Sequence, residues 1–229
     1  MVVTFLTLGS GWIYAEEAVF PQVQSNSPLV QQDAFTMAAP EIKCLLKSEG
    51  IDEQTASKTS DVLARALPKI QLDGRKFNRI SFLHFLAQIK SESGAGQNET
   101  QIGDQPPNKK GYGLNQVTGF DNLEDCAKCM NQVQPGLGDG VVQSPETTVG
   151  AHGDPYKSAM ISLCWWRNNI VNNSRNDSIC LQPTGVAVID ITQISNSGHI
   201  GGKVTGGEAS LDKREDSFQK LLAAQCQGS

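Results

Sequence analysis

The stretch FLAQIKSESG, residues 85–94, ends an apolar helical pattern with a glutamate and then a glycine. Glu92 follows Phe85 by seven residues and Ile89 by three, so all three share one helical face. Such a face normally packs into the core, and a carboxylate on it is either paired or held half-buried for chemistry. A carboxylic acid that is shielded from water keeps its proton more readily, which is the form that a general acid needs. Glu92 is therefore the first candidate for a catalytic residue.

The cysteines are a second set of residues that could do chemistry. They are Cys44, Cys126, Cys129, Cys164, Cys180 and Cys226. Cys126 and Cys129 have C-x-x-C spacing, but the chain has no second such pair, and its histidines lack the spacing of zinc ligands. An even number of cysteines predicts up to three structural disulfides without fixing their pairing. The sequence predicts no metal site and implies no cofactor.

The elements that must position Glu92 are predicted to be helices. Asn78 is expected to cap the helix RISFLHFLAQIKSE, in which apolar residues recur at helical spacing. Residues 185–194 are rich in β-branched residues and favour a strand, with a helix as the open alternative. Long polar loops are expected over 94–112 and 134–154. The fold is therefore predicted to be mainly helical.

The other helices are expected at 41–49, from a cap at Asp52 or Thr55 to Pro68, within 113–133, at 155–171, and at 210–226 with Ser210 as its cap.

Composition and the N-terminus bear on where the protein works. A net charge of −5 argues against a nucleic-acid-binding protein, and no apolar run reaches the ~20 residues that span a bilayer. Residues 1–15 resemble a secretory signal that ends at Ala15, with a buried strand as the alternative. We interpret 16–40 as a linker or arm and 41–229 as one domain, and we expect a secreted or periplasmic monomer.

Four stretches resemble, in order, the characteristic segments of glycoside hydrolase family 19, the chitinase and phage-endolysin family. FLAQIKSESG is similar to the family's FLAQIAHESGG, and GYGLNQVTGFDN (111–122) is similar to GRGLIQLTGRANY. SAMISLCWWRNNIVN (158–172) resembles the family's helix with a WFW core and a following asparagine. VTGGEASLDKREDSFQKL (204–221) resembles INGGxNGLxDRxxYxxxA.

This resemblance implies a lysozyme-like, two-lobed helical domain with a cleft. It implies hydrolysis of β-1,4 linkages in a polysaccharide that contains N-acetylglucosamine, either chitin or peptidoglycan, with inversion at the anomeric carbon. Glu92 takes the position of the general acid. The positions that match the family's sugar-binding cleft and last block are Gln116, Thr118, Asn122 and Arg214, with Tyr112 in place of the arginine of GRG.

An inverting hydrolase needs a second carboxylate, about 6.5–9.5 Å from the first, to activate water. In the family it lies between the general acid and the GRG turn, a segment that is shorter here. Glu99 is the first choice and Asp104 the alternative. Ser91 and Thr205 also depart from the family pattern, which has histidine and asparagine at these positions.

Two other functions remain open. Lytic transglycosylases also show a Glu-Ser pair followed by a G-L-x-Q turn, and they need only one catalytic glutamate. A non-catalytic sugar-binding relative is the other reading. Glu92→Gln is expected to abolish cleavage, because glutamine cannot donate an acidic proton. Thermal stability is expected to stay unchanged or rise slightly, because a desolvated carboxyl destabilises a fold.

Overall fold

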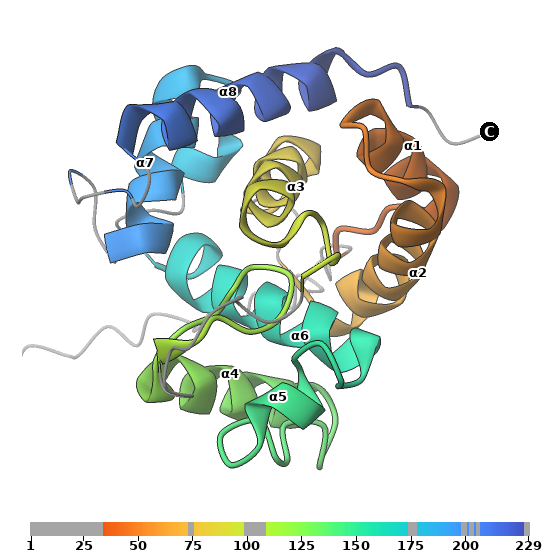
Figure 1. Ribbon diagram of the computed structural model, residues 1–229, viewed down its shortest axis with the longest axis vertical. Coiled ribbons are helices and arrows are strands. Elements are labelled where there is room, and N and C mark those ends of the chain that lie inside the picture. Colours follow the sequence, from red (N-terminus) through yellow and green to blue (C-terminus); the bar gives the residue numbers. More distant parts are fainter. Residues whose placement is uncertain are drawn as a thin grey trace, which may run out of the picture. The chain divides into compact units, whose positions relative to one another are not determined.

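Helix α3 (Arg79–Ser93) lies in the middle of the helices in the computed structural model, with α1, α2, α6, α7 and α8 around it (Figure 1). It begins at Asn78, whose side chain accepts a hydrogen bond from the Ser81 N–H at 3.2 Å, as predicted. It ends at Gly94, which has a φ of 61° and so takes the left-handed conformation that stops helices. Every residue from Ser81 to Ile89 is buried, so the predicted apolar stripe belongs to a helix enclosed on all faces.

The structure describes residues 34–72, 76–98, 109–173, 178–197, 201, 204 and 207–226. The predicted signal segment and most of the predicted arm lie outside these residues. The described part is mainly helical and contains no strand. No helix within it is both long and apolar enough to cross a bilayer. Its helices, besides α3, are α1 (Ala39–Ser48), α2 (Glu53–Ile70), α4 (Phe120–Val133), α5 (Pro145–Thr148), α6 (Pro155–Trp166), the π-helix η2 (Arg167–Val171), the 3-10 helix η3 (Ile179–Leu181), α7 (Gly185–Ser197) and α8 (Gly207–Ala223).

The structure corrects the sequence prediction at two helix boundaries and adds one short helix. Helix α2 is capped by Asp52 but continues through Pro68 to Ile70. A proline removes one backbone hydrogen bond, and the full burial of Leu67 and Ile70 outweighs that loss. Helix α8 begins at Gly207, so Ser210 is not its cap. The 134–154 loop contains the short helix α5.

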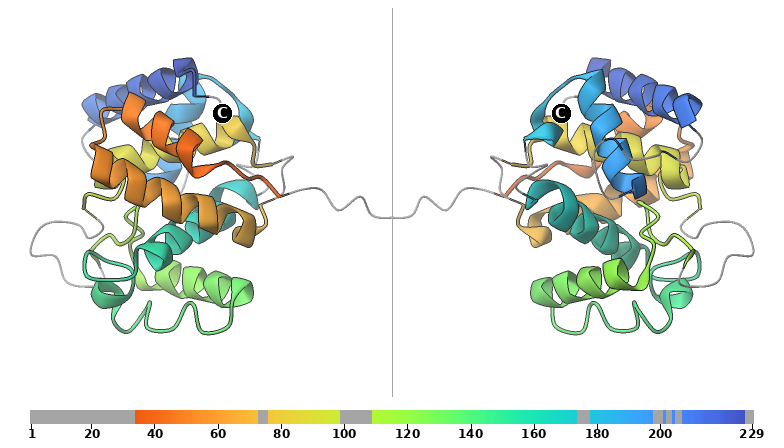
Figure 2. Two further views of the ribbon diagram at one scale, coloured as in Figure 1. Left: turned by 90° about the vertical axis from the view of Figure 1, so that its right-hand side faces the viewer. Right: turned by 90° about the vertical axis from the view of Figure 1, so that its left-hand side faces the viewer.

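Residues 185–194 form helix α7 and not a strand. Val188, Ile191 and Ile194 recur every three residues and are all buried, which gives the segment an apolar helical face. Figure 2 shows α7 packed beside α8. Tertiary packing of this face outweighs the strand propensity of the β-branched side chains.

Two disulfides are present where up to three were predicted. Cys44–Cys226 joins α1 to the residues that follow α8, and Cys129–Cys164 joins α4 to α6. Cys126 and Cys180 are buried thiols. Burial raises the pKa of the Cys126 thiol, so this group is unreactive while the protein stays folded.

We expect thiol titration to find two free thiols per chain when the oxidised protein is denatured without a reductant. After reduction the same titration should find six. A native protein titrated without denaturant should react slowly, because both thiols are buried. Six thiols, or none, in the denatured oxidised protein would contradict this pairing.

His84 is a buried histidine that α3 holds between two other elements. Its ring stacks on Phe218 of α8, with 3.9 Å between ring centroids, and its Nε2 is 2.8 Å from the Gln182 carbonyl oxygen. Burial lowers the pKa of His84 from 6.5 to about 4. The imidazole is therefore neutral at physiological pH.

This histidine should make the fold sensitive to acid. Between the folded pKa of about 4 and the unfolded value of 6.5, the unfolded chain binds more protons. The stability is therefore fully present above pH 6.5 and decreases as the pH falls towards 4, by up to about 3 kcal/mol. We expect urea unfolding of His84→Phe, measured at several pH values, to show a shallower decrease over this range. Parallel curves for the two proteins would show that His84 does not titrate in this way.

Candidate functional site

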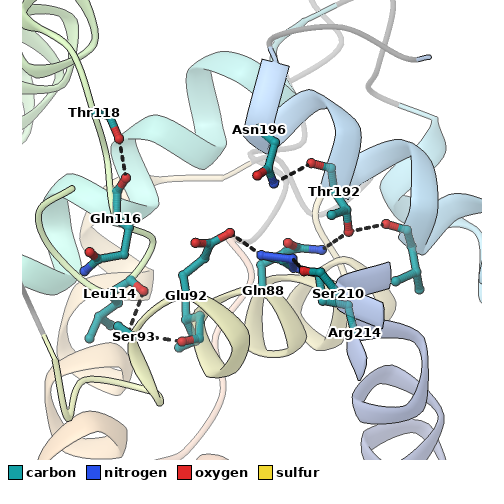
Figure 3. Close-up of polar contacts among 12 residues, drawn as sticks. Gln88, Glu92, Ser93, Leu114, Gln116, Thr118, Thr192, Asn196, Ser210 and Arg214 are labelled. Atoms are coloured by element: carbon teal, nitrogen blue, oxygen red, sulfur yellow. Dashed lines mark hydrogen bonds and ion pairs between the residues drawn. The ribbon is translucent and has the colours of Figure 1, made fainter. Parts of the chain in front are cut away.

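The site is built around an ion pair between Glu92 and Arg214. Glu92 lies in the last turn of α3, and Arg214 reaches it from α8, 122 residues further along the chain (Figure 3). The side chain of Arg214 is 4% exposed and that of Glu92 is 24% exposed. Arg214 also donates a hydrogen bond of 2.9 Å to the Ser210 hydroxyl, one turn earlier in α8. Two predicted site residues from separate motifs are thus in direct contact.

The surroundings of Glu92 differ from the apolar setting that its sequence position suggested. Phe85 and Ile89 are fully buried, but the carboxylate one turn later meets a guanidinium. Arg214 has acidic neighbours in the sequence and by default would be a surface residue. Its side chain turns inward to Glu92 instead, because a buried guanidinium needs an anion.

Gln88 lies one turn before Glu92 on the same side of α3 and links this helix to α7. Its Nε2 donates a hydrogen bond of 2.9 Å to the Thr192 hydroxyl, and Thr192 donates to the Val188 carbonyl at 2.7 Å. Gln88 and Thr192 are both fully buried. The bond therefore ties α7 to the helix that carries Glu92.

A tight turn at residues 113–116 lies beside the end of α3. Tyr112 and Val117 close it through two backbone hydrogen bonds of 3.0 and 2.8 Å. The Ser93 hydroxyl, directly after Glu92, donates to the Leu114 carbonyl at 2.7 Å. Gly113 has a φ of 74°, and a Cβ there would lie 2.7 Å from the Ile161 side chain, so only glycine fits. The turn is thus fixed against both α3 and α6.

The turn presents Gln116, which has a positive φ of 52°. Its Nε2 donates to the carbonyl oxygens of Gly113 and Asn98, both at 3.0 Å. The Thr118 hydroxyl donates to the Gln116 carbonyl at 2.9 Å, and the Asn122 Nδ2 donates to the Thr118 carbonyl at 2.8 Å. The three predicted sugar-binding residues therefore form one connected group.

These three residues line a pocket of about 370 Å³. Figure 3 shows Glu92 between Gln116 and Asn196, both of which belong to the pocket wall. The lining residues are Asn115, Gln116, Val117, Thr118, Asn122, Trp165, Asn169, Ile194, Ser195, Asn196 and Ser197. All of them are uncharged, so the described wall suits a neutral ligand that forms hydrogen bonds.

The structure places the remaining predicted residues differently. Tyr112 is 1% exposed, packs in the core and supports the turn, so its ring is not on the pocket wall. Glu99 and its alternative Asp104 lie outside the described residues. Of the adjacent tryptophans Trp165 and Trp166, Trp166 is fully buried, whereas Trp165 is 7% exposed and lines the pocket.

Several lining residues were not predicted from the sequence. Asn115 neighbours Gln116 in a turn, where asparagine is common for backbone reasons alone. Asn169 lies in the π-helix η2, which follows α6 directly. Such widened turns often occur at functional sites, but they cannot be recognised from residue types. Ser195 lies in α7, which the sequence favoured as a strand.

Comparison with protein-family models, with curated proteins and with solved structures finds no match to this chain.

The ion pair leads to a stability prediction that reverses the sequence-based expectation. Glu92→Gln removes the anion from a guanidinium that is almost wholly buried, so we expect it to lower the free energy of unfolding by about 1–3 kcal/mol. In an Arg214→Met background the same substitution should have little effect, because the buried charge is gone. The measurement is urea unfolding of the wild type, both single variants and the double variant.

Glu124→Gln is the matched control. Glu124 pairs with Lys128 on the exposed surface of α4, so its loss should change stability by well under about 1 kcal/mol. A Glu92→Gln protein that is as stable as the Glu124→Gln protein would show that the Arg214 contact contributes nothing.

Proposed function

We propose that the protein is a glycoside hydrolase that cleaves β-1,4 linkages in N-acetylglucosamine polymers, chitin or peptidoglycan, with Glu92 as the general acid. The observation that carries the proposal is the Glu92–Arg214 pair beside a pocket lined by Gln116, Thr118 and Asn122. The resemblance to family 19 selected these residues from three separate stretches. The fold brings them to one place.

The chemistry of Glu92 follows from its partner. To cleave a glycosidic bond, an acid gives its proton to the leaving oxygen while water attacks the anomeric carbon. The structure pairs Glu92 as a carboxylate with the guanidinium of Arg214, so as the general acid it must take up a proton before each cleavage. When it gives that proton to the leaving oxygen, the guanidinium stabilises the negative charge that returns. No reorganisation of the protein is needed at that moment. Arg214 is thus a positioning and electrostatic partner.

Inversion requires a base, and we propose Glu99 for this role. Glu99 directly follows Asn98 in the sequence. The carbonyl oxygen of Asn98 accepts a hydrogen bond from Gln116, which lines the pocket. A single-carboxylate transglycosylase is the alternative, because no carboxylate is present in the described pocket wall. The products distinguish the two: hydrolysis leaves reducing ends, and transglycosylation leaves anhydro-muramyl ends.

We further propose that the helical unit is lysozyme-like, with two lobes and the pocket in its cleft. The mainly helical architecture is consistent with this. Two disulfides favour an oxidising compartment, which supports a secreted or periplasmic protein.

The test is cleavage of a chitin oligomer and of purified peptidoglycan. We expect Glu92→Gln to lower turnover by roughly 10²–10⁴-fold, because glutamine cannot donate an acidic proton. Glu124→Gln should keep wild-type activity. A folded Glu92→Gln protein that cleaves at the wild-type rate would exclude Glu92 as the proton donor.

The same assay separates the candidates for the second carboxylate. If Glu99 is the base, Glu99→Gln should lower turnover and leave binding of the oligomer intact. If Asp104 is the base, Asp104→Asn should have that effect instead. Activity that survives both substitutions, with anhydro products, would indicate the transglycosylase. Binding without any cleavage by the wild type would indicate a sugar-binding relative.

A further inference from the structure

Two residues that line the pocket beside Glu92 each carry a buried polar atom without a hydrogen-bond partner in the described protein. Asn115 Oδ1 and Ser195 Oγ have no hydrogen-bond partner among the described residues, and both residues line the pocket. Asn115 is only 7% exposed. Buried polar groups without partners are rare in native proteins because they destabilise the fold, and they are often kept for a ligand.

The neighbouring polar groups are already occupied, which sets these two apart. The Nε2 of Gln116 and the Nδ2 groups of Asn122 and Asn196 all donate to backbone carbonyls. These bonds hold the wall in shape. Among the lining residues, Asn115 Oδ1 and Ser195 Oγ are the buried side-chain atoms that have no such bond within the described protein.

Both side chains are mounted on fixed backbone but can turn. The N–H of Asn115 donates to the Ser162 hydroxyl at 3.1 Å, which anchors the backbone of the turn to α6. The last torsion of an asparagine side chain is broad, and a rotation about it is the movement that would turn the buried Oδ1 towards the pocket. Ser195 lies in α7, which the Gln88–Thr192 bond holds against α3, and its hydroxyl hydrogen rotates freely.

The same pocket has an apolar part. Val117, Trp165 and Ile194 line it, at 2%, 7% and 3% exposure. A ligand group that satisfies the whole arrangement carries one N–H donor, one carbonyl acceptor and a small apolar end within a few bonds. An acetamido group has these three features.

We propose that Asn115 and Ser195 recognise the acetamido group of an N-acetylated sugar. Asn115 Oδ1 accepts the hydrogen bond of the amide N–H, the Ser195 hydroxyl donates to the acetyl carbonyl oxygen, and the methyl group packs against Val117, Trp165 and Ile194. A de-N-acetylated sugar loses all three contacts. This inference rests on the proposed function, because it assumes that a sugar occupies the pocket.

The resemblance to family 19 does not supply this polar atom. Asn115 stands where the family's GRGLIQLTG has isoleucine. Replacing Asn115 by leucine keeps its shape and removes its polar atoms, so the variant tests recognition with little disturbance of packing.

The experiment measures binding of two chitin oligomers of equal length, one fully N-acetylated and one de-N-acetylated. The protein is the full chain with Glu92→Gln, which binds without turnover, and the pH is mildly alkaline so that the sugar amines are largely uncharged. We expect the acetylated oligomer to bind at least about tenfold more tightly. Asn115→Leu and Ser195→Ala, added to this protein, should each reduce that preference by about three- to tenfold.

The melting temperature separates recognition from a structural role of Asn115, because the loss of a structural contact would lower it. Removing the unpaired buried Oδ1 of Asn115 should leave the melting temperature of Asn115→Leu unchanged or higher. Asn172→Ala, at an exposed asparagine beyond η2, is the matched control and should keep both binding and preference.

The possible outcomes separate this inference from the proposed function. Equal binding of the two oligomers, or a preference that survives both substitutions, overturns the acetamido assignment and leaves the glycosidase proposal standing. If neither oligomer binds and the wild type cleaves neither chitin nor peptidoglycan, both the acetamido assignment and the glycosidase proposal are overturned. A lower melting temperature of Asn115→Leu with unchanged preference would make Asn115 a structural residue only.

Discussion

The charge of Arg214 is the constraint on which the site depends. A guanidinium with 4% exposure is tolerated only if an anion reaches it, and Glu92 supplies that anion from a different helix. The pairing fixes the rotation of α8 about its own axis relative to α3. A second polar contact acts in the same direction, since buried Glu49 at the end of α1 accepts hydrogen bonds from Lys90 of α3 and Ser217 of α8. Together the contacts of Glu92 and Glu49 fix α1, α3 and α8 relative to one another.

The same pairing places Glu92 between stability and chemistry. An enclosed apolar setting would leave the side chain without a counter-charge, whereas the guanidinium of Arg214 supplies one. In the glycosidase that we propose, this counter-charge stabilises the carboxylate when it gives up its proton. It also makes the carboxylate a contributor to the fold. Substitutions of Glu92 therefore carry a cost in stability that a catalytic residue on a free surface would not have.

The parts of the structure that the sequence could predict are those decided by local interactions. The caps at Asn78 and Asp52 are side-chain bonds to backbone three residues away; Asn78 was predicted, and Asp52 was one of two predicted alternatives. The continuation of α2 through Pro68 and the helical state of α7 depend on packing between distant elements. Contact between Glu92 and Arg214 could not be derived from spacing, because 122 residues separate them. Asn115 and Ser195 gave no signal at all, since polar residues in turns and on helices are ordinarily solvated.

The end of α3 explains how one short segment can organise the whole pocket. Gln88, Glu92 and Ser93 each bond to a different element: Gln88 to α7, Glu92 to α8, and Ser93 to the 113–116 turn. Two of those elements, α7 and the turn, supply most of the pocket wall. Helix α3 is buried from Ser81 to Ile89, and its partly exposed last turn is held by these contacts and by buried Ser93. The position of the carboxylate relative to the pocket wall is thus set by a helix whose middle is buried in the core, and in the glycosidase that we propose such a fixed position lowers the entropy lost when the substrate is bound for reaction.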